Sequence, residues 1–315
     1  MGFAFTVLLL LPCTAFSDWS PLVNRLIGDG FDETEMRALF SRPELKFEPV
    51  SMSAKIQELV SRYPDKPAQP FSYNPRAIHW AYFKDKVISR ARSYLRENSE
   101  LLDKISKEYC VPKEVIVSIL LVETRLGDFV GGRAAFNSLA GMALCTDLET
   151  IRPYLPRKLI TAKNQDYART VCRQKSDWAY DELKALILYT SSAGLDPLSL
   201  RGSVYGAIGI CQFMPSNIFF YGVDADNDGR IDLFSKADAL TSVANYLRGH
   251  GWQCAMDKPD KIRVIFDYNH SSAYANTVLV LSDLLMRDQS SKDRPPKDRS
   301  LKNRTAAKHK KNSPA

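Results

Sequence analysis

Apolar residues recur at spacings of three and four through most of the chain, which is the pattern of amphipathic helices. Alternating runs that would indicate β-strands are scarce, so the sequence predicts an all-α or strongly α-rich fold. A helix is expected to begin after Asp32, which suits the N-cap position, whereas residues 48–76 are rich in Pro and Tyr and are predicted to be irregular. The longer predicted helices cover residues 79–109, 112–127, 177–194, 237–251 and 263–286.

The start of the chain differs from its body. Residues 3–12 form an apolar run too short to cross a bilayer as a helix, and Ala15 and Ser17 place small residues at the positions that a signal peptidase reads. This pattern predicts a signal peptide over residues 1–17 and hence a periplasmic or cell-envelope protein. Two alternatives stay open. One is a buried N-terminal helix; the other is a lipid anchor on Cys13, although Pro12 stands where a lipidation signal has a small residue.

The formal net charge of +7 is confined to the end of the chain. Ten of the 43 basic residues and three of the 36 acidic residues lie in residues 287–315, so residues 1–286 are neutral. A neutral body argues against a fold with a basic nucleic-acid-binding face, and no nucleic-acid partner is expected. The tail is almost free of apolar residues and is predicted to be disordered. It serves either as a solubilising tail or as a weak contact with an anionic wall or membrane.

Six cysteines are present, and removal of the signal peptide would leave five, an odd number. No Cys-x-x-Cys motif occurs, which argues against a zinc or thioredoxin-like site. Cys145 and Cys172 flank one segment and could form a disulfide in an oxidising compartment. The sequence otherwise leaves open the pairing among Cys110, Cys145, Cys172, Cys211 and Cys254.

The segment 112–127 holds the most informative acidic residue. Glu123 lies three residues after Leu120 and four after Ile119, which places it on an apolar stripe of the predicted helix. A poorly solvated carboxyl group has a raised pKa and stays protonated near neutral pH, as a general acid for glycosidic cleavage requires. The alternative is a buried glutamate paired with Arg125.

Two further segments carry polar residues in unusual settings. Residues 202–216 are rich in small residues, and their neutral Ser203 and Gln212 suit hydrogen bonds to a sugar; a tight structural turn is the alternative. No Gly-Lys-Ser or Gly-Lys-Thr follows, which excludes a phosphate-binding loop. Tyr268 and Asn269, with Tyr274 beyond, suit sugar stacking and amide recognition, but aromatic residues at this spacing could equally belong to the core.

Alternating aspartates followed by glycine resemble the first half of an EF-hand calcium loop. The candidate ligands are the carboxylates of Asp224, Asp226 and Asp228 and the carbonyl of Arg230. The twelfth position is a serine rather than the usual glutamate, and Asp238 could close a longer loop. The alternative is an acidic turn without a metal.

Taken together, these segments resemble the lytic murein transglycosylase B family, glycoside hydrolase family 103. The resemblance covers residues 19–286, and its motifs occur in the family's order. They are Val122–Gly127, Gly202–Ser216, the aspartate loop, Ala244–Trp252 and Tyr268–Ser271.

The resemblance implies one lysozyme-like catalytic domain over residues 18–286, which cleaves the MurNAc–GlcNAc β-1,4 bond of peptidoglycan and leaves a 1,6-anhydroMurNAc end. It implies a monomer that acts on glycan strands without an organic cofactor. Glu123 matches the family's single acid/base. Ser203 and Gln212 match residues of the cleavage subsites, and the sugar contacts correspond to Tyr246, Tyr268, Asn269 and Tyr274. The calcium loop corresponds to Asp224, Asp226, Asp228, Arg230 and Asp238.

The chain departs from the family pattern at two places. Cys211 stands where the family usually has glycine, directly before Gln212. Residues 142–156 lack the usual Pro-Arg-Arg stretch, for which Arg152 and Arg157 are possible substitutes, so no peptide-stem binding is assigned. Two alternative functions therefore stay open: a hydrolytic muramidase and a wall-binding protein with an inactive cleft.

Overall fold

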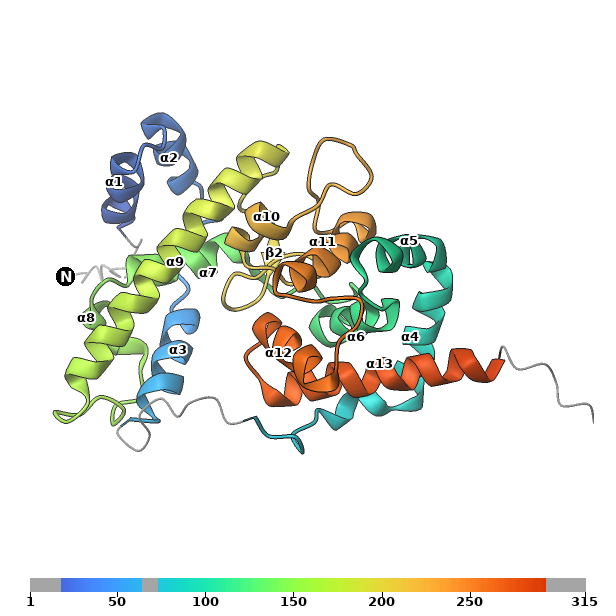
Figure 1. Ribbon diagram of the computed structural model, residues 1–315. Helices are drawn as coiled ribbons and strands as arrows, with labels where there is room; N and C mark the ends of the chain where they lie inside the picture. The colour runs from blue at the N-terminus through green and yellow to red at the C-terminus, as the bar shows by residue number, and fades with distance from the viewer. Residues whose placement is uncertain (1–17, 64–72, 293–315) are drawn as a thin grey trace, which may run out of the picture. The chain divides into compact units, whose positions relative to one another are not determined.

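The structure is a computed structural model that describes residues 18–63 and 73–292 (Figure 1). The expected signal peptide over residues 1–17 and the chain from residue 293 onward lie outside the described residues. By their contacts, the described residues form two compact units. The first unit contains residues 18–63, 130–220 and 227–233, and the second contains residues 73–129, 221–226 and 234–292.

The first unit is built on a long helix, α9 (Gln165–Ala193), which packs against α7 (Ala135–Leu144) and α3 (Val50–Val60). Its only sheet among the described residues is a short antiparallel pair, β1 (Arg133–Ala134) and β2 (Arg201–Gly202). The remaining elements of this unit are α1 (Ser20–Gly28), α2 (Glu33–Phe40), α8 (Leu148–Ile151), the 3-10 helix η2 (Arg152–Tyr154) and most of α10 (Pro215–Tyr221).

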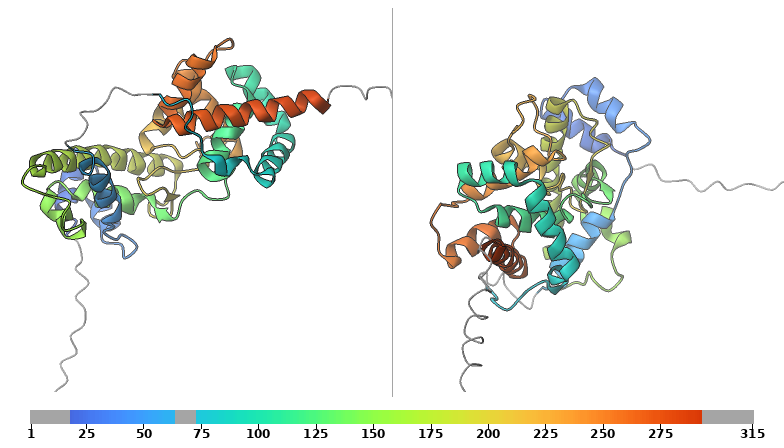
Figure 2. Two further views of the ribbon diagram at one scale, coloured as in Figure 1. Left: turned by 90° about the horizontal axis from the view of Figure 1, so that it is seen from below. Right: turned by 90° about the vertical axis from the view of Figure 1, so that its right-hand side faces the viewer.

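The second unit surrounds one central helix, α6 (Lys113–Thr124). Every residue from Val115 to Leu121 is at most 2% exposed, so this helix is apolar on all sides rather than along one stripe. Four helices pack on it: α4 (Asp85–Glu97), α5 (Ser99–Tyr109), α11 (Lys236–Gly249) and α13 (Ser272–Lys292). The 3-10 helix η1 (Trp80–Phe83) and α12 (Lys258–Tyr268) complete the unit. Figure 2 shows α13 as a single long helix.

The α-rich prediction is confirmed, and the Asp32 carboxylate caps α2 by accepting from the Glu35 N–H at 2.8 Å. Several boundaries were wrong. Residues 48–76 are not irregular throughout, because Met52, Ile56 and Val60 recur every four residues and bury one face of α3. The predicted helix 79–109 is divided into η1, α4 and α5, with a break at Asn98, whose side chain donates to the Tyr94 carbonyl.

Three other predicted helices also differ in extent. Residues 263–286 belong to two helices, α12 and α13, separated at residues 269–271. The predicted helix 177–194 begins earlier, at Gln165, as α9. Helix α13 continues to Lys292, so the first part of the predicted tail is helical rather than disordered. Among the described residues, no helix combines the length and apolarity needed to cross a bilayer.

The suggested pairing of Cys145 with Cys172 is wrong. The disulfide of the described chain joins Cys110 to Cys254 in the second unit, with their Cα atoms 4.7 Å apart. Cys145 and Cys172, both buried in the first unit, stay reduced and bond to backbone carbonyls: Cys172 donates to the Cys145 carbonyl and Cys145 to that of Gly141, each at 3.2 Å. Burial raises the pKa of Cys145 to about 12 and that of Cys172 to about 11, so both thiols are held in the unreactive protonated form.

Candidate active site

Glu123 lies at the end of the central helix of the second unit, one residue before α6 stops at Thr124. The helix was predicted to reach residue 127. It stops earlier because Arg125 and Leu126 both adopt left-handed backbone conformations, with φ of 54° and 66°. Their N–H groups bond back to the carbonyls of Leu121 and Leu120, and the Thr124 hydroxyl accepts from the following Gly127 N–H. Two consecutive non-glycine residues in this region are strained, and such strain often occurs at functional sites.

Burial raises the pKa of the Glu123 carboxyl to about 7, and the neighbouring Tyr274 side chain opposes that shift. The Glu123 side chain as a whole is half-buried, but its carboxyl group is closely surrounded by protein atoms and so is poorly solvated. Among the described residues, Glu123 forms no ion pair with Arg125, whose side chain is exposed. The alternative of a glutamate neutralised by Arg125 therefore has no support in this geometry.

Two tyrosines interact with this carboxyl group, Tyr82 and Tyr274, and two more continue from Tyr274. The Tyr82 hydroxyl donates to the carbonyl of Val122 at 3.0 Å, and burial together with the Glu123 charge raises the pKa of Tyr82. Tyr274 stacks on Tyr268, with ring centroids 6.3 Å apart, and Tyr268 meets the edge of Tyr246 at 4.9 Å. The second unit thus brings three of the predicted sugar-contacting residues into one row that ends at Glu123.

The rings of this row differ in exposure. Tyr246 and Tyr274 are 6% and 3% exposed, so they pack as core residues, and the Tyr246 hydroxyl donates to the Asp267 carbonyl. Tyr268 is half-buried, and Asn269 is exposed just after the end of α12. The accessible sugar-contact candidates are therefore Tyr268 and Asn269. Sequence reasoning did not single out Tyr82, whose position in the aromatic run Trp80–Phe83 is a signal that could have found it.

Ser203 and Gln212 lie in the first unit, on a compact turn. The Ser203 hydroxyl accepts from the N–H groups of Tyr205 and Ala207, at 3.2 and 3.0 Å. The Gln212 amide nitrogen donates to the carbonyls of Val130 and Gly209, both at 3.0 Å. Glycine is required at residue 209, because its φ is 76° and a Cβ atom there would lie 2.4 Å from the Leu233 side chain.

Cys211, the departure noted in the sequence, is fully buried in the first unit. Its side chain therefore occupies the interior, while the half-exposed Gln212 beside it remains accessible. Arg152, suggested as a substitute for the missing basic stretch, forms two hydrogen bonds with Glu149 at 2.7 and 2.9 Å.

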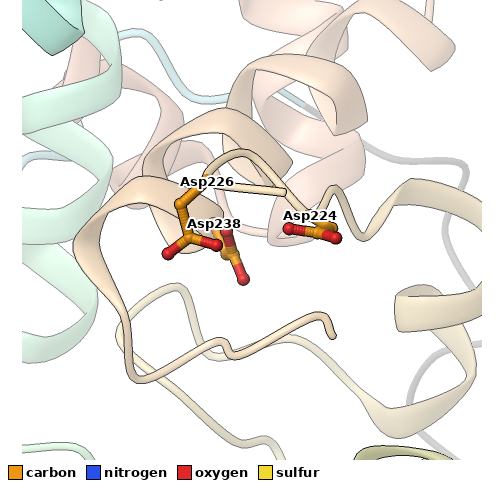
Figure 3. A group of neighbouring side chains, drawn as sticks. All are labelled: Asp224, Asp226 and Asp238. Carbon is orange, nitrogen blue, oxygen red and sulfur yellow. The ribbon is translucent and has the colours of Figure 1, made fainter. Parts of the chain in front are cut away.

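Three of the predicted calcium ligands come together in the second unit (Figure 3). Carboxylate oxygens of Asp224, Asp226 and Asp238 all lie within 4.8 Å of one another. Two oxygens bound to one calcium ion at its usual distances are at most about 5 Å apart, so this spacing fits. Asp238 is 1% exposed and also accepts from the Ala225 N–H at 2.8 Å.

Asp228 and Arg230 fall in the short segment 227–233 of the first unit, where the Asp228 carboxylate accepts from the Arg230 N–H at 2.9 Å. The Gly229 φ of 88° matches the sharp turn that glycine makes at the sixth position of an EF-hand loop. The donor set and the turn thus fit a hard divalent cation.

Comparisons with known proteins agree with this reading of the fold. Membrane-bound lytic murein transglycosylase B of Escherichia coli K12 is 29% identical over 231 residues, which are 71% of this chain and 54% of that protein. The chain thus spans about half the length of this curated relative. The soluble lytic transglycosylase SltB1 of Pseudomonas aeruginosa has a TM-score of 0.64 and 25% identity, over 86% of this chain and 99% of that one.

A further solved structure is the Escherichia coli lytic transglycosylase Slt35 in complex with calcium. It has a TM-score of 0.62 and 20% identity, over 86% of this chain and 93% of that one. These similarities confirm the lysozyme-like transglycosylase fold expected from the sequence. Residues 15–259 match the family described as the transglycosylase SLT domain, more than three quarters of the chain. The chain belongs to the transglycosylase SLT domain family.

Proposed function

We propose that this protein is a peptidoglycan lytic transglycosylase that cleaves the MurNAc–GlcNAc β-1,4 bond, with Glu123 as its single general acid/base. The observation that carries the proposal is the Glu123 carboxyl, whose burial raises its pKa to about 7. At neutral pH such a group exists in comparable amounts as acid and as base. One residue can then give a proton in the first half of a reaction and take one back in the second.

The first step is proton donation from Glu123 to the glycosidic oxygen. The bond to C1 then breaks, and positive charge develops on the MurNAc ring. Among the described residues, Tyr274 is the side chain that shifts the pKa of the Glu123 carboxyl, and the Glu123 charge in turn raises the pKa of Tyr82; no second carboxylate takes part in these interactions. We therefore propose that the positive charge at C1 is stabilised by the substrate's own N-acetyl group rather than by a second protein carboxylate.

In the second step, ionised Glu123 removes the proton of the MurNAc C6 hydroxyl. The C6 oxygen attacks C1 and closes the 1,6-anhydro ring, so the leaving GlcNAc keeps the first proton and Glu123 regains its own. No water is consumed. Attack from within the same sugar is favoured because the C6 oxygen is already held near C1.

The substrate contacts are proposed residue by residue. Tyr268 and Asn269 offer an aromatic face and an amide, and the packed rings of Tyr246 and Tyr274 support them. Ser203 keeps its hydroxyl proton for donation, because both of its known hydrogen bonds are accepted ones. Gln212 keeps its amide oxygen as an acceptor, because its nitrogen already donates to two carbonyls.

A calcium ion is proposed for the loop of Asp224, Asp226 and Asp238, with Asp228 and the Arg230 carbonyl as further ligands. The three carboxylates, with oxygens within 4.8 Å of one another, form a compact set of the oxygen ligands that calcium prefers. A bound ion would cross-link the loop that follows α10 to the first turn of α11, where Asp238 lies. This role is structural, and the cleavage steps do not involve the metal.

The proposed setting is the periplasm or cell envelope, with peptidoglycan strands as the partner and the chain acting as a monomer. A signal peptide over residues 1–17 would export it. The basic tail within residues 287–315 would add a weak contact with the anionic wall or membrane, because each basic residue near such a membrane contributes about 1 kcal/mol.

The decisive experiment is digestion of purified sacculi followed by mass spectrometry of the soluble products. We expect muropeptides with anhydro ends, which are one water lighter than reducing ends, and no release by Glu123→Gln. Reducing ends alone would identify a muramidase. Binding to sacculi without any release would identify a wall-binding protein, and an active Glu123→Gln variant would remove Glu123 from its proposed role.

A further inference from the structure

Glu182 is a buried carboxyl group that the proposed chemistry does not use. It lies in the middle of α9, next to the fully buried Leu183, and is 6% exposed. Among the described residues it forms no ion pair, and both of its oxygens accept from a single residue, Ser216. One oxygen accepts from the Ser216 backbone N–H at 2.9 Å, and the other from the Ser216 hydroxyl at 2.8 Å.

A buried carboxyl group without a cation is unfavourable unless hydrogen bonds satisfy it. Burial raises the pKa of Glu182, and the two Ser216 bonds oppose that shift. The pair is therefore a specific contact between two distant segments of the first unit. The contact holds the segment that carries Ser216 against α9.

Ser216 is the second residue of α10, where backbone N–H groups have no partner within their own helix. In a capped helix, a side chain just before the first turn accepts from this group. Here the acceptor comes from α9, more than 30 residues earlier in the chain. Glu182 therefore fixes the start of α10 against the longest helix of its unit.

The segment before Ser216 is the turn that carries Gln212. Ile208 and Phe213 exchange both backbone hydrogen bonds, at 2.8 and 3.1 Å, and Gln212 at the tip has a left-handed φ of 53°. The amide of Gln212 cannot be reversed, because its nitrogen faces two carbonyl groups that can only accept. Its oxygen is thus the group left for an external donor.

We propose that Glu182 is a positioning residue: by holding both donors of Ser216, it fixes the turn 208–216 so that the Gln212 amide oxygen meets a sugar N–H or O–H group. The role of the Gln212 oxygen in binding a sugar rests on the proposed function, whereas the Glu182–Ser216 hydrogen bonds do not depend on it. Glu182 acts through Ser216 and the backbone, and it touches no sugar.

The test compares two replacements of similar volume. Glu182→Gln can accept from the Ser216 N–H and donate to its hydroxyl oxygen, so it should keep more than half of the wild-type activity on sacculi. Glu182→Met has no acceptor and should lose at least tenfold. Asp181→Asn is the matched control, since Asp181 is the exposed neighbour of Glu182 on α9 and, among the described residues, forms its ion pair with Lys184; it should leave activity unchanged.

A double-variant cycle separates positioning from a general loss of stability. If Glu182 acts through Gln212, adding Glu182→Met to Gln212→Ala should cause no further loss of activity. Losses that multiply would overturn the proposal, as would equal losses in Glu182→Gln and Glu182→Met. If Glu182→Met does not fold, Ser216→Ala replaces it in the cycle, because this variant removes only the hydrogen bond of the Ser216 hydroxyl.

Hydrogen exchange provides a readout that needs no activity. Amides of residues 209–217 should exchange at least tenfold faster in Glu182→Met than in the wild type, while those of α7 should not change. Unchanged exchange in the turn would refute the claim that Glu182 holds it in place, even in an active enzyme. Faster exchange in a protein that never releases muropeptides would support that claim and refute the proposed function instead.

Discussion

The raised pKa of Glu123 should make this residue destabilising above neutral pH. A group whose folded-state pKa lies above its unfolded value is most favourable to folding when protonated, and that advantage is lost as the pH rises through the folded-state value. For Glu123 the folded value is about 7 against 4.5 for the free group. The difference corresponds to about 3 kcal/mol at pH 8, and the effect declines to about 0.2 kcal/mol at pH 4.

The perturbation that measures this effect is Glu123→Gln, which replaces the carboxyl group with a neutral group of the same shape. The variant should be more stable than the parent by up to about 3 kcal/mol at pH 8, and the two should be nearly equal at pH 4. Urea unfolding at both pH values gives these free energies directly. Glu97→Gln serves as the control, because Glu97 is an exposed glutamate at the end of α4.

A difference that is the same at pH 4 and pH 8 would refute the reasoning, because it would show that shape rather than ionisation separates the two proteins. A variant less stable than the parent at pH 8 would show that the ionised carboxyl has a favourable partner in the folded protein. In either case Glu123 would not be a desolvated acid, and the main support for its catalytic role would be lost.

Three further predictions follow from other contacts. The Tyr274 hydroxyl lowers the pKa of Glu123, so Tyr274→Phe should raise that pKa and move the alkaline limit of sacculus digestion upward by up to about one pH unit. The Tyr246 hydroxyl instead donates to the Asp267 carbonyl, so Tyr246→Phe should leave the limit unchanged. EGTA should lower the thermal midpoint by several degrees, and Asp238→Asn should abolish that response; a midpoint indifferent to calcium would exclude the metal. Replacing Cys110 and Cys254 by serine should cost about 2–5 kcal/mol in urea unfolding, and an equally stable double variant would contradict it.

The local sequence predicts the burial of Glu123 but not the way in which its helix is covered. An acid at the end of a strongly apolar run implies burial wherever the helix packs, and the structure buries its carboxyl. The expected single stripe was wrong, because four helices cover α6 on all sides. That arrangement depends on residues from both ends of the second unit, which no periodicity within residues 112–127 can indicate.

Contacts between distant segments account for the other omissions. The Cys110–Cys254 disulfide spans 144 positions, whereas the suggested Cys145–Cys172 pair rests on the two cysteines flanking one segment of the chain. Glu182 has the sequence context of an ordinary solvent-facing residue, with Asp181 and Lys184 nearby, and only the folded structure shows its burial and its contact with Ser216. Helix α3 was missed because the Pro- and Tyr-rich residues after it dominated the composition of residues 48–76.

The distribution of cysteines has a consequence for how the protein is produced. The covalent link of the described residues lies in the second unit, which carries Glu123, while the first unit contains the buried cysteines Cys145, Cys172 and Cys211. A chain made in a reducing cytosol would lack the link only in the unit with the proposed acid. During refolding, three additional thiols could capture Cys110 or Cys254 in the wrong pair. Expression with export to an oxidising compartment, or refolding with Cys145, Cys172 and Cys211 replaced, should therefore give the more uniform preparation.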